Sequence, residues 1–250
     1  MAEDLLQIRD LRKSFGGIAV TAGVSLSVRR GETHALIGPN GAGKTTLIAQ
    51  LSGDLRPDAG QVLWYGRDVT RLPPYRRSRL GMARSFQITS VFMDLTVLDN
   101  VALAVQARAG HSFRFWAPAR RDGRLTEPAM AVLAQVGLAG RAGQPASILS
   151  HGERRALEIA MALATEPELL LLDEPMAGMG PEESSEMIAT LRGLKSHKTI
   201  LLVEHDMDAV FALADRISVL VYGKIIAAGT PEEIRNDAHV RRAYLGEEAA

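Results

Sequence analysis

The feature that most constrains this chain is a glycine-rich turn between an apolar run and a helical pattern. Residues 38–45 are Gly-Pro-Asn-Gly-Ala-Gly-Lys-Thr, and they fill every position of the pattern G-x-x-x-x-G-K-[ST]. The apolar run at residues 34–37 precedes the turn, and a helical pattern at residues 44–51 follows it. Such a loop aims backbone N–H groups at an anion, and the helix dipole adds to the attraction. The sequence therefore predicts that the chain binds a nucleoside triphosphate.

The whole loop and the first helical residues are expected to hold the nucleotide. Lys44 is expected to reach the terminal phosphates, and the hydroxyl of Thr45 to coordinate Mg²⁺. A chance glycine-rich turn is the alternative, and the strand–loop–helix context argues against it. The predicted nucleotide-binding residues of this segment are Gly38, Pro39, Asn40, Gly41, Ala42, Gly43, Lys44, Thr45 and Thr46.

A second apolar run, at residues 169–172, ends in the two carboxylates Asp173 and Glu174. A strand that is apolar on both faces belongs in the middle of a parallel sheet, and ligands bind at the carboxyl ends of such strands. We therefore expect Asp173 to hold Mg²⁺ through water, and Glu174 to orient or deprotonate the attacking water. The alternative is a pair of solvated acids at a strand end.

The next apolar run, residues 199–203, is followed by Glu204, His205 and Asp206. His205 is expected to emerge at the same edge of the sheet and to contact the γ-phosphate, because groups that converge on one edge form sites. The alternative is that His205 only fills a polar position at the strand end.

Strands and helices alternate along the second half of the chain, which predicts an α/β protein with a mainly parallel sheet covered on both faces. Residues 111–124 contain three bulky aromatic side chains among four arginines and are predicted to be an irregular loop. Contact with a lipid surface or a partner remains possible for this loop, as does a packed insertion with solvated arginines. Strands are predicted at residues 5–8, 24–28, 34–37, 61–65, 169–172, 199–203 and 217–222. Helices are predicted at residues 44–51, 75–80, 96–107, 130–135, 152–164, 181–194 and 207–214.

Composition excludes several classes of function. Among 250 residues, 29 basic side chains balance 29 acidic ones, so no basic footprint for nucleic acid is present. The chain has no cysteine, which excludes disulfides, thiolate catalysis and cysteine-bound metal. Neither a basic signal-peptide start nor an apolar stretch of about 18 residues is found, so we expect no membrane span.

A further motif is Leu-Ser-His-Gly-Glu at residues 149–153, where Ser150 is placed to cap a following helix. Ordinary helix capping is the alternative to a functional role. The order of phosphate loop, Gln87, this signature segment, the acidic strand and then a histidine resembles the ATP-binding subunit of ABC transporters over essentially the whole chain.

The resemblance implies a fold. It is an ABC nucleotide-binding domain of the P-loop NTPase (RecA-like) class, with an inserted helical subdomain and an N-terminal antiparallel β portion. The chain is then one domain, residues 1–250. Residues 1–88 and 160–226 form the nucleotide-binding core, residues 89–159 the helical subdomain, and residues 227–250 a C-terminal tail that either regulates or pads the core.

The resemblance also implies a mechanism in which two subunits meet head to tail around ATP and Mg²⁺. Phe15 would stack on adenine, and Ser150 and Gly152 would contact the γ-phosphate held by the other subunit. Gln87 would sense the γ-phosphate and Mg²⁺ and link the core to the helical subdomain. The implied catalytic residues are Glu174, His205 and Gln87, and the implied metal ligands are Thr45, Gln87 and Asp173.

Two departures from the family pattern narrow the resemblance. The signature usually is Leu-Ser-Gly-Gly-Gln, but His151 and Glu153 stand here, and Glu153 is expected to point away from ATP because both are anionic. The family often has a Leu-Asp pair where this chain has Met179 and Gly180, so one dimer contact lacks its carboxylate. With residues 175–178, 229–234 and 242–247, these departures resemble the branch that imports branched-chain or hydrophobic amino acids, or urea.

The implied function is ATP hydrolysis coupled to import through a multi-span membrane permease. The implied partners are a second ATP-binding subunit, identical or paralogous, the permease and, indirectly, a solute-binding protein, with no nucleic acid. Residues 87–95 are expected to receive a helix of the permease, with Phe92 either exposed for this contact or buried. The expected location is peripheral, at the cytoplasmic face of the inner (plasma) membrane. The alternatives are a soluble ABC-type ATPase that acts in DNA repair, translation or cofactor assembly, and a small-molecule kinase.

Overall fold

The strand that precedes the glycine-rich turn lies in the interior of a six-stranded sheet with the order β10-β9-β3-β8-β7-β6. This computed structural model describes residues 3–85, 91–110, 122–195 and 197–240. Strand β3 pairs in parallel with β8 and β9, and β7 pairs in parallel with β8 and β6, whereas β10 is antiparallel to β9. The predicted, mainly parallel sheet is confirmed. Its strands are β3 (Thr33–Ile37), β6 (Met82–Arg84), β7 (Leu169–Asp173), β8 (Thr199–Val203), β9 (Arg216–Val221) and β10 (Lys224–Gly229).

A second sheet is antiparallel, with the order β2-β1-β4-β5, and confirms the N-terminal antiparallel β portion. Its first two strands are much longer than the predicted runs at residues 5–8 and 24–28. Shifts of register interrupt the β1–β2 ladder, and the outer half of this ribbon is exposed, so its side chains show no apolar alternation. The strands are β1 (Asp4–Phe15), β2 (Ile18–Arg29), β4 (Ala59–Trp64) and β5 (Arg67–Asp68).

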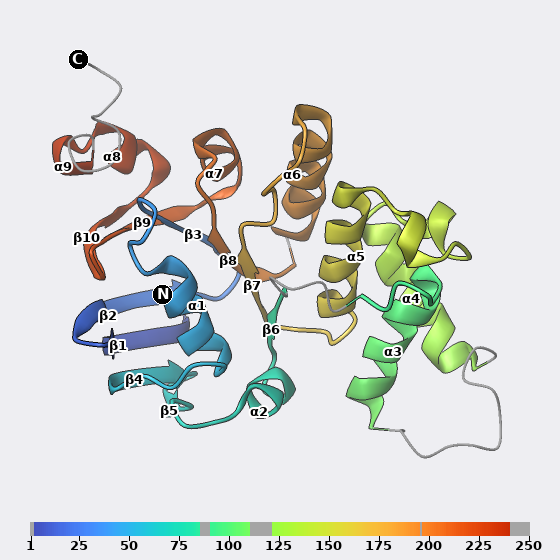
Figure 1. Cartoon of the computed structure of the whole chain (residues 1–250), viewed down its shortest axis with the longest axis horizontal. Helices are drawn as coiled ribbons and strands as arrows, with labels where there is room; N and C mark the ends of the chain where they lie inside the picture. Colours follow the sequence, from blue (N-terminus) through green and yellow to red (C-terminus); the bar gives the residue numbers. More distant parts are fainter. Residues whose placement is uncertain (1–2, 86–90, 111–121, 196, 241–250) are drawn as a thin grey trace.

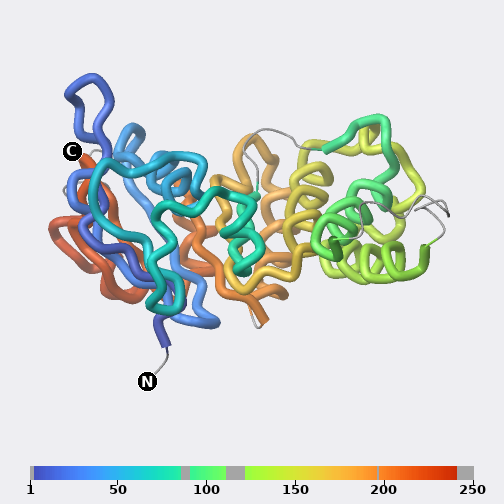
Figure 2. Tube along the Cα trace, turned by 90° about the horizontal axis from the view of Figure 1, so that it is seen from below, coloured from blue at the N-terminus to red at the C-terminus, as the bar shows by residue number. Residues whose placement is uncertain are grey.

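Helices cover both faces of the six-stranded sheet (Figure 1). Helix α1 lies between the two sheets, whereas α3, α4 and α5 form a group at the opposite end of the molecule, and the view from below shows the same separation (Figure 2). The helices are α1 (Lys44–Ser52), α2 (Pro74–Arg79), α3 (Val97–Ala109), α4 (Gly123–Gln135), α5 (His151–Leu163), α6 (Pro181–Lys195), α7 (Met207–Leu213), α8 (Pro231–Asn236) and α9 (Ala238–Val240). Two 3₁₀ turns are η2 (Ala139–Arg141) and η3 (Ala146–Ile148).

Strand β7 shows why the sheet needs helices on both sides. Leu169 and Leu171 belong to the apolar cluster around α1 and the N-terminal sheet, while Leu170 and Leu172 belong to the cluster around α5 and α6. All four side chains are buried, as alternation along a strand covered on both faces requires. This packing fixes the direction of β7 and hence the place of the carboxylates that follow it.

Helix α4 differs from the prediction. It begins at Gly123, capped by the side chain of Asp122, and passes through Pro128, whereas the pattern predicted a helix only from residue 130. The irregular loop predicted at residues 111–124 is therefore wrong at its end, and residues 111–121 lie outside the described residues. A proline inside a helix removes one hydrogen bond, but the buried face of α4, including Leu125, Ala129 and Leu133, holds the helix together.

The C-terminal segment packs against the core as far as residue 240, and whether it also regulates stays open. Strand β10 and helices α8 and α9 had no counterpart among the predicted elements, and they pack on the end of the sheet. Ile234 and Val240 are buried in a cluster with Ile37 and Val219. Among the residues that the structure describes, no helix combines the length and the apolar character that spanning a membrane requires.

Candidate functional site

The phosphate loop, residues 38–43, joins β3 to α1 in a path that only glycine permits at two points. Gly38 has φ 156°, and a Cβ added there would lie 2.0 Å from the carbonyl oxygen of Leu220. Gly43, the N-cap of α1, has φ 104°, and its Cβ would lie 2.4 Å from the carbonyl oxygen of Val20. The two glycines let the loop lie directly against β2 and β9, which fixes its shape before any ligand arrives.

The N-terminus of α1 opens into this loop. No side chain caps the helix in the described structure, and the first amide that bonds back into it is that of Leu47, to the Gly43 carbonyl. The Lys44 ammonium donates to the carbonyl oxygens of Gly38, at 2.6 Å, and Pro39, at 3.1 Å. Burial lowers the pKa of Lys44, and the carboxylates of Glu174 and Asp173 act in the opposite direction. The loop thus presents N–H groups and a buried cation to an anion.

Three adjacent strands end at one edge of the sheet, which we call the carboxyl edge. The neighbours β3, β8 and β7 are parallel, so the phosphate loop, His205 and the pair Asp173–Glu174 emerge side by side. The prediction that His205 shares an edge with the other two motifs is therefore confirmed. Its ring is exposed, with 59 % of the side chain open to solvent, and its Nδ1 lies 3.7 Å from Oε2 of the buried Glu204.

Asp173 is a buried carboxylate with one oxygen unused. Its Oδ2 accepts from the Arg84 guanidinium at 3.2 Å, whereas Oδ1 is buried without a hydrogen-bond partner among the described residues. Burial raises the pKa of Asp173 despite the opposing effect of Arg84. An oxygen in this state fits a water-mediated or direct contact with a hard cation such as Mg²⁺, which takes few protein ligands and keeps water and phosphate oxygens. Among the described residues no group of three or more His, Asp or Glu is arranged to hold a metal alone.

Glu174 follows directly in a left-handed backbone conformation, with φ 49°. Its N–H donates to the carbonyl of Val203 on β8, at 2.9 Å, which ties the two loops of the carboxyl edge together. A non-glycine residue in this region of backbone space costs free energy and is often found at functional sites.

Glu204 was missed by sequence reasoning and holds the same two loops. Its side chain is fully buried, Oε1 accepts the N–H of Met176 at 3.0 Å, and Oε2 accepts the N–H of His205 at 3.0 Å. The only sequence signal was an acidic residue between an apolar strand and a histidine. Arg84, the partner of Asp173, was also missed, because nothing in the sequence linked it to residue 173.

The signature segment begins α5 with a capping box. The Ser150 hydroxyl accepts the N–H of Glu153, and the Glu153 carboxylate accepts the N–H of Ser150 in return. The same carboxylate pairs with Arg141 at 2.8 Å. Glu153 is therefore turned back onto its own helix and an arginine; that it points away from ATP stays a prediction.

Glu183 in the first turn of α6 also contacts the signature segment. Its Oε1 accepts the Ser150 hydroxyl at 3.0 Å and the Gly152 N–H at 3.3 Å. His151 bonds through Nε2 to the carbonyl of Ala177, at 3.0 Å. The signature segment is thus attached to the loop after Glu174 and to the helix that follows it.

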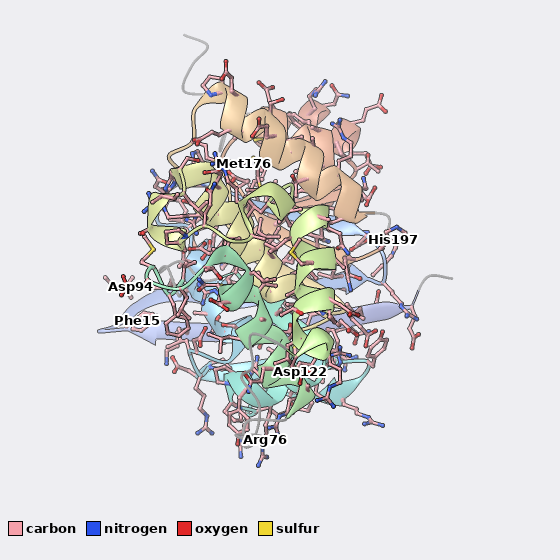
Figure 3. The ribbon with its side chains drawn as sticks, turned by 90° about the vertical axis from the view of Figure 1, so that its right-hand side faces the viewer. Phe15, Arg76, Asp94, Asp122, Met176 and His197 are labelled. Carbon is pink, nitrogen blue, oxygen red and sulfur yellow. The ribbon has the colours of Figure 1, made fainter. Side chains whose placement is uncertain are left out.

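The predicted site residues fall into two groups within one chain. The carboxyl edge carries residues 38–46, 173–174 and 205, while Ser150 and Gly152 lie at the start of α5, on the far side of β7 from α1 (Figures 1 and 2). Phe15 lies at the end of β1, with 48 % of the residue exposed, in the ribbon that projects from the molecule in Figure 3. Gln87 lies outside the described residues, and its predicted roles remain predictions.

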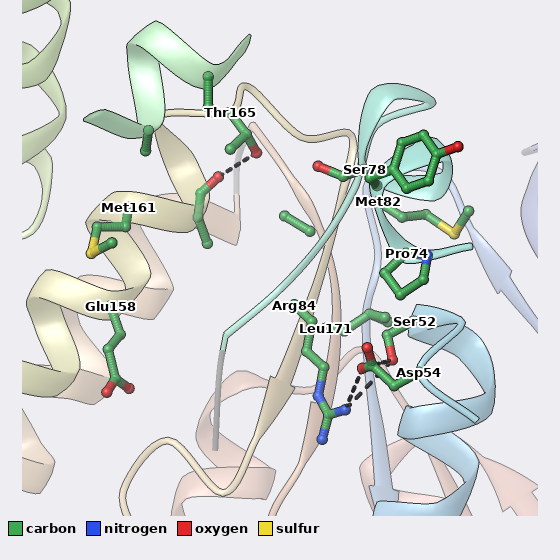
Figure 4. A pocket seen from close by; sticks show the side chains of 15 residues that line it. Ser52, Asp54, Pro74, Ser78, Met82, Arg84, Glu158, Met161, Thr165 and Leu171 are labelled. Carbon is green, nitrogen blue, oxygen red and sulfur yellow. Dashed lines mark hydrogen bonds and ion pairs between the residues drawn. The ribbon is translucent and has the colours of Figure 1, made fainter. Parts of the chain in front are cut away.

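An apolar groove of about 350 Å³ lies between the edge of the sheet and the helices (Figure 4). It is lined by residues of α2, β6, α3 and α5, among them Tyr75, Met82, Ala104 and Met161. Arg84 projects into it and bonds to Asp54 at 3.0 Å while also holding Asp173. The groove therefore adjoins the carboxyl edge through one side chain.

Comparison with known proteins identifies the family. The model of the ABC transporter family matches residues 21–177. A branched-chain amino acid transport ATP-binding protein, LivG of Salmonella typhimurium, is 41% identical over 99% of this chain and 100% of its own length. The chain belongs to the ABC transporter family. As an ATP-binding cassette of this family it binds and hydrolyses ATP.

Further matches agree with this assignment. The model named "Branched-chain amino acid ATP-binding cassette transporter" matches residues 224–250. LivG of Escherichia coli is 39% identical and BraF of Pseudomonas aeruginosa 37% identical, each over 99% of this chain and 100% of its own length. A solved nucleotide-free ABC cassette superposes with a TM-score of 0.85 at 31% identity, over 98% of this chain and 100% of that one. An ABC cassette in its ADP conformation gives 0.86 at 30% identity, over 98% and 99%. The predicted P-loop NTPase cassette fold is confirmed.

Proposed function

We propose that this chain supplies the energy for import of branched-chain or other hydrophobic amino acids through a membrane permease. The curated relatives named above are high-affinity branched-chain amino acid transport ATP-binding proteins, and they match over their whole length. The observation that carries the chemistry is the convergence of Lys44, Asp173, Glu174 and His205 at the carboxyl edge. A soluble ABC-type ATPase without a permease is not favoured by these relatives.

Each residue of the carboxyl edge has a distinct task in this proposal. The phosphate loop and Lys44 bind the terminal phosphates, and Phe15 stacks on the adenine. Glu174 takes a proton from the attacking water, and His205 donates to the γ-phosphate. Thr45, Asp173 and Gln87 would hold Mg²⁺, which would neutralise phosphate charge.

The active unit in this proposal is a pair of subunits. The separation of Ser150 and Gly152 from the phosphate loop of the same chain supports a head-to-tail arrangement. In it, the signature segment of one subunit closes over the ATP of the other. The second subunit is an identical chain or a paralogue.

In this proposal the permease contacts the apolar groove and residues 91–93. Phe92 is 57% exposed and Tyr75, at the groove, also 57%, so both offer apolar surface to a partner helix. Phe92 is thus available for contact, which was one of the two alternatives left open by the sequence. The proposed location is the cytoplasmic face of the inner (plasma) membrane, held there by the permease, with a solute-binding protein as an indirect partner.

The replacement Glu174→Gln tests the chemical step. It is expected to reduce ATP turnover by at least about a hundredfold, because a general base is lost, while ATP binding is retained. ATP-bound pairs are expected to accumulate, which light scattering measures. Turnover at the wild-type rate would remove Glu174 from the mechanism.

Mixing two inactive variants tests the shared site. Ser150→Ala lacks a signature hydroxyl and Lys44→Ala lacks a phosphate ligand, so a mixed pair holds one site with both residues intact. Mixtures are expected to regain ATPase activity that neither variant has alone. No rescue at any ratio would contradict the head-to-tail arrangement.

Copurification distinguishes the permease hypothesis from the hypothesis of a soluble ABC-type ATPase. The chain is expected to sediment with membrane vesicles because it binds a multi-span protein. The reconstituted complex is expected to take up branched-chain amino acids when ATP is added. Recovery of the chain free of membranes and bound to nucleic acid would favour the soluble ATPase.

A further inference from the structure

In the single subunit, the N-terminus of α5 already binds an anionic group of the same chain, the carboxylate of Glu183. Glu183 Oε1 lies 3.0 Å from the hydroxyl of Ser150 and 3.3 Å from the amide nitrogen of Gly152. These two donors are the ones that the proposed function assigns to the γ-phosphate of the second subunit. A carboxylate and a phosphate oxygen are both anionic acceptors, so they compete for the same hydrogens.

The surroundings of Glu183 favour its charged form. The Ser150 hydroxyl, together with the N–H groups of Gly152 and Gly180, lowers the pKa of Glu183 against a smaller opposing effect of burial. Gly180 stands directly before α6 and Gly152 in the first turn of α5, so the carboxylate lies between two helix N-termini. Each N-terminus carries partial positive charge, which an anion between them offsets.

The contact of Glu183 with Ser150 and Gly152 can also be broken without burying the carboxylate. The start of α5 opens into a hollow of about 650 Å³, lined among others by Gly152, Glu183 and Glu186, so open space adjoins the Glu183 side chain. Glu183 keeps the N-terminus of its own helix, α6, as a place for its charge when it leaves α5.

We propose that Glu183 is an intramolecular competitor for the γ-phosphate. In the unpaired subunit its carboxylate holds the Ser150 hydroxyl and the Gly152 N–H, and it gives them up when the nucleotide of the second subunit docks. The proposal rests on the head-to-tail pair described above. Its consequence is that Glu183 raises the ATP concentration needed for pairing and keeps unpaired subunits apart.

The experiment measures pairing as a function of ATP in the Glu174→Gln background, where turnover does not consume the nucleotide. Adding Glu183→Gln keeps the size and one acceptor oxygen of the side chain but removes its charge. The ATP concentration at half-maximal pairing is expected to fall about twofold to fivefold. This is the size of effect expected from one partly exposed charge, here the Glu183 carboxylate that competes with the γ-phosphate. Sedimentation velocity measures the fraction of pairs.

Glu182→Gln is the matched control. Glu182 is the neighbouring carboxylate in the first turn of α6 and is exposed, and the replacement changes the net charge equally. It is expected to pair at the ATP concentration of the parent. An equal shift in both variants, or no shift in Glu183→Gln, would overturn the proposal.

A second variant guards against a folding defect in the first. Glu183→Asp keeps the charge on α6 but shortens the side chain by one methylene, so the carboxylate is drawn away from Ser150. It is expected to lower the ATP requirement in the same direction as Glu183→Gln. An unchanged requirement in Glu183→Asp would count against direct competition.

Two further measurements separate this inference from the proposed function. In the nucleotide-free subunit, Glu183→Ala is expected to speed hydrogen exchange of the Gly152 amide several-fold, since it loses its acceptor. Ser150→Ala is expected to weaken ATP-dependent pairing. If Ser150→Ala weakens pairing but Glu183→Gln does not change it, only the competition fails. If Ser150→Ala pairs like its parent, the head-to-tail arrangement itself fails.

Discussion

Two helix N-termini of this chain are proposed to face a phosphate, and they are built in opposite ways. Helix α1 starts at a left-handed glycine without a side-chain cap, so its amides are available to a ligand. Helix α5 is capped by Ser150 in a capping box, and the carboxylates of Glu153 and of Glu183, which belongs to α6, both accept hydrogen bonds at its N-terminus. The N-terminus of α1 is therefore open to an anion, whereas donor groups at the N-terminus of α5 already have hydrogen-bond acceptors.

This difference suits the N-terminus of α1 to nucleotide binding and the N-terminus of α5 to the proposed pairing of subunits. An open N-terminus with a buried lysine binds the nucleotide in a single subunit, because little has to move. A capped N-terminus binds a phosphate only by exchanging one acceptor for another, so its affinity is smaller. In the proposed pair, nucleotide binding is therefore expected to come first and pairing second.

The largest expected effect comes from filling the glycine of each N-terminus with a methyl group. Gly43→Ala places Cβ against the backbone of Val20 and strains a φ of 104°, so ATP affinity is expected to fall at least about a hundredfold. In Gly152→Ala the methyl lies 3.0 Å from the Glu183 side chain, which can move, so the melting temperature is expected to hold. The methyl also crowds the amide that the proposed γ-phosphate would need, and this is expected to outweigh the displacement of Glu183, so that pairing needs more ATP. Isothermal titration calorimetry and sedimentation measure the two effects. Equal ATP affinity in Gly43→Ala and the wild type would contradict the difference proposed between the N-termini of α1 and α5.

The second prediction concerns the far end of α1. Arg77 is buried and donates to the carbonyl oxygens of Gln50 and Leu51, at 2.7 and 2.6 Å, which lie in the last turn of α1. Burial lowers its pKa to about 10, so it stays charged at neutral pH. Arg77→Ala is expected to lower the free energy of unfolding by about 3 kcal/mol, since these buried acceptors lose a charged donor.

Urea denaturation measures this loss of stability. Arg76 is the control because it lies next to Arg77 on α2, is exposed and only stacks near Tyr75. Arg76→Ala is expected to change stability by no more than about 0.5 kcal/mol. A similar small change for Arg77→Ala would show that α1 needs no anchor at its C-terminus.

The third prediction uses the raised pKa of Asp173. A carboxyl whose folded pKa lies above its unfolded value of 3.8 binds more protons in the folded state. The ionised group therefore destabilises the nucleotide-free fold increasingly as pH rises from the unfolded pKa to the folded one, by a constant amount at higher pH, and not at all well below the unfolded pKa. Asp173→Asn is expected to stabilise this form by about 1 kcal/mol at pH 7, and by nothing near about pH 3.

Thermal melting of the nucleotide-free protein across this pH range checks the sign. Asp58 is a carboxyl of opposite behaviour, because Lys13 and the N–H of Ser14 lower its pKa. Asp58→Asn is expected to lose stability above the unfolded pKa and to match the wild type in acid. A lower melting temperature of Asp173→Asn at pH 7 would mean that the contact with Arg84 outweighs burial.

The smallest effect is expected at the cap of α5. Glu153→Gln keeps the reciprocal capping bond but loses the ion pair with the half-exposed Arg141. Stability is expected to fall by about 0.5 kcal/mol, or about 1–2 °C in melting temperature. Glu153→Ala, which loses the cap bond as well, is expected to fall further. Equal losses in both variants would show that the cap bond carries no free energy.

The sequence predicted the carboxyl edge well because its signals are local. Apolar runs that end in polar residues define both the strand and the side chains at its end, and parallel pairing then aligns those ends. The phosphate loop, Asp173–Glu174 and His205 were placed in this way. The start of α4 was missed because Pro128 breaks the local pattern, while tertiary packing of its buried face decides the outcome.

Residues that act on distant backbone atoms could not be predicted. Glu204 accepts an amide 28 residues away, and Arg77 donates to carbonyls 26 and 27 residues away. Neither contact leaves a motif, because any backbone offers the same groups. Glu183 is similar, since its partner Ser150 stands 33 positions earlier and only the folded chain brings the two together.

The strand order has a consequence for synthesis on the ribosome. Strand β3 carries the phosphate loop and lies between β8 and β9, neither of which exists until residue 199 and beyond has been made. At typical elongation rates β3 waits roughly 8 to 30 s for its first neighbour. During that interval a nascent chain exposes an apolar strand with no hydrogen-bonding partner. A chaperone that shields such segments is therefore expected to raise the yield of native protein in cell-free translation.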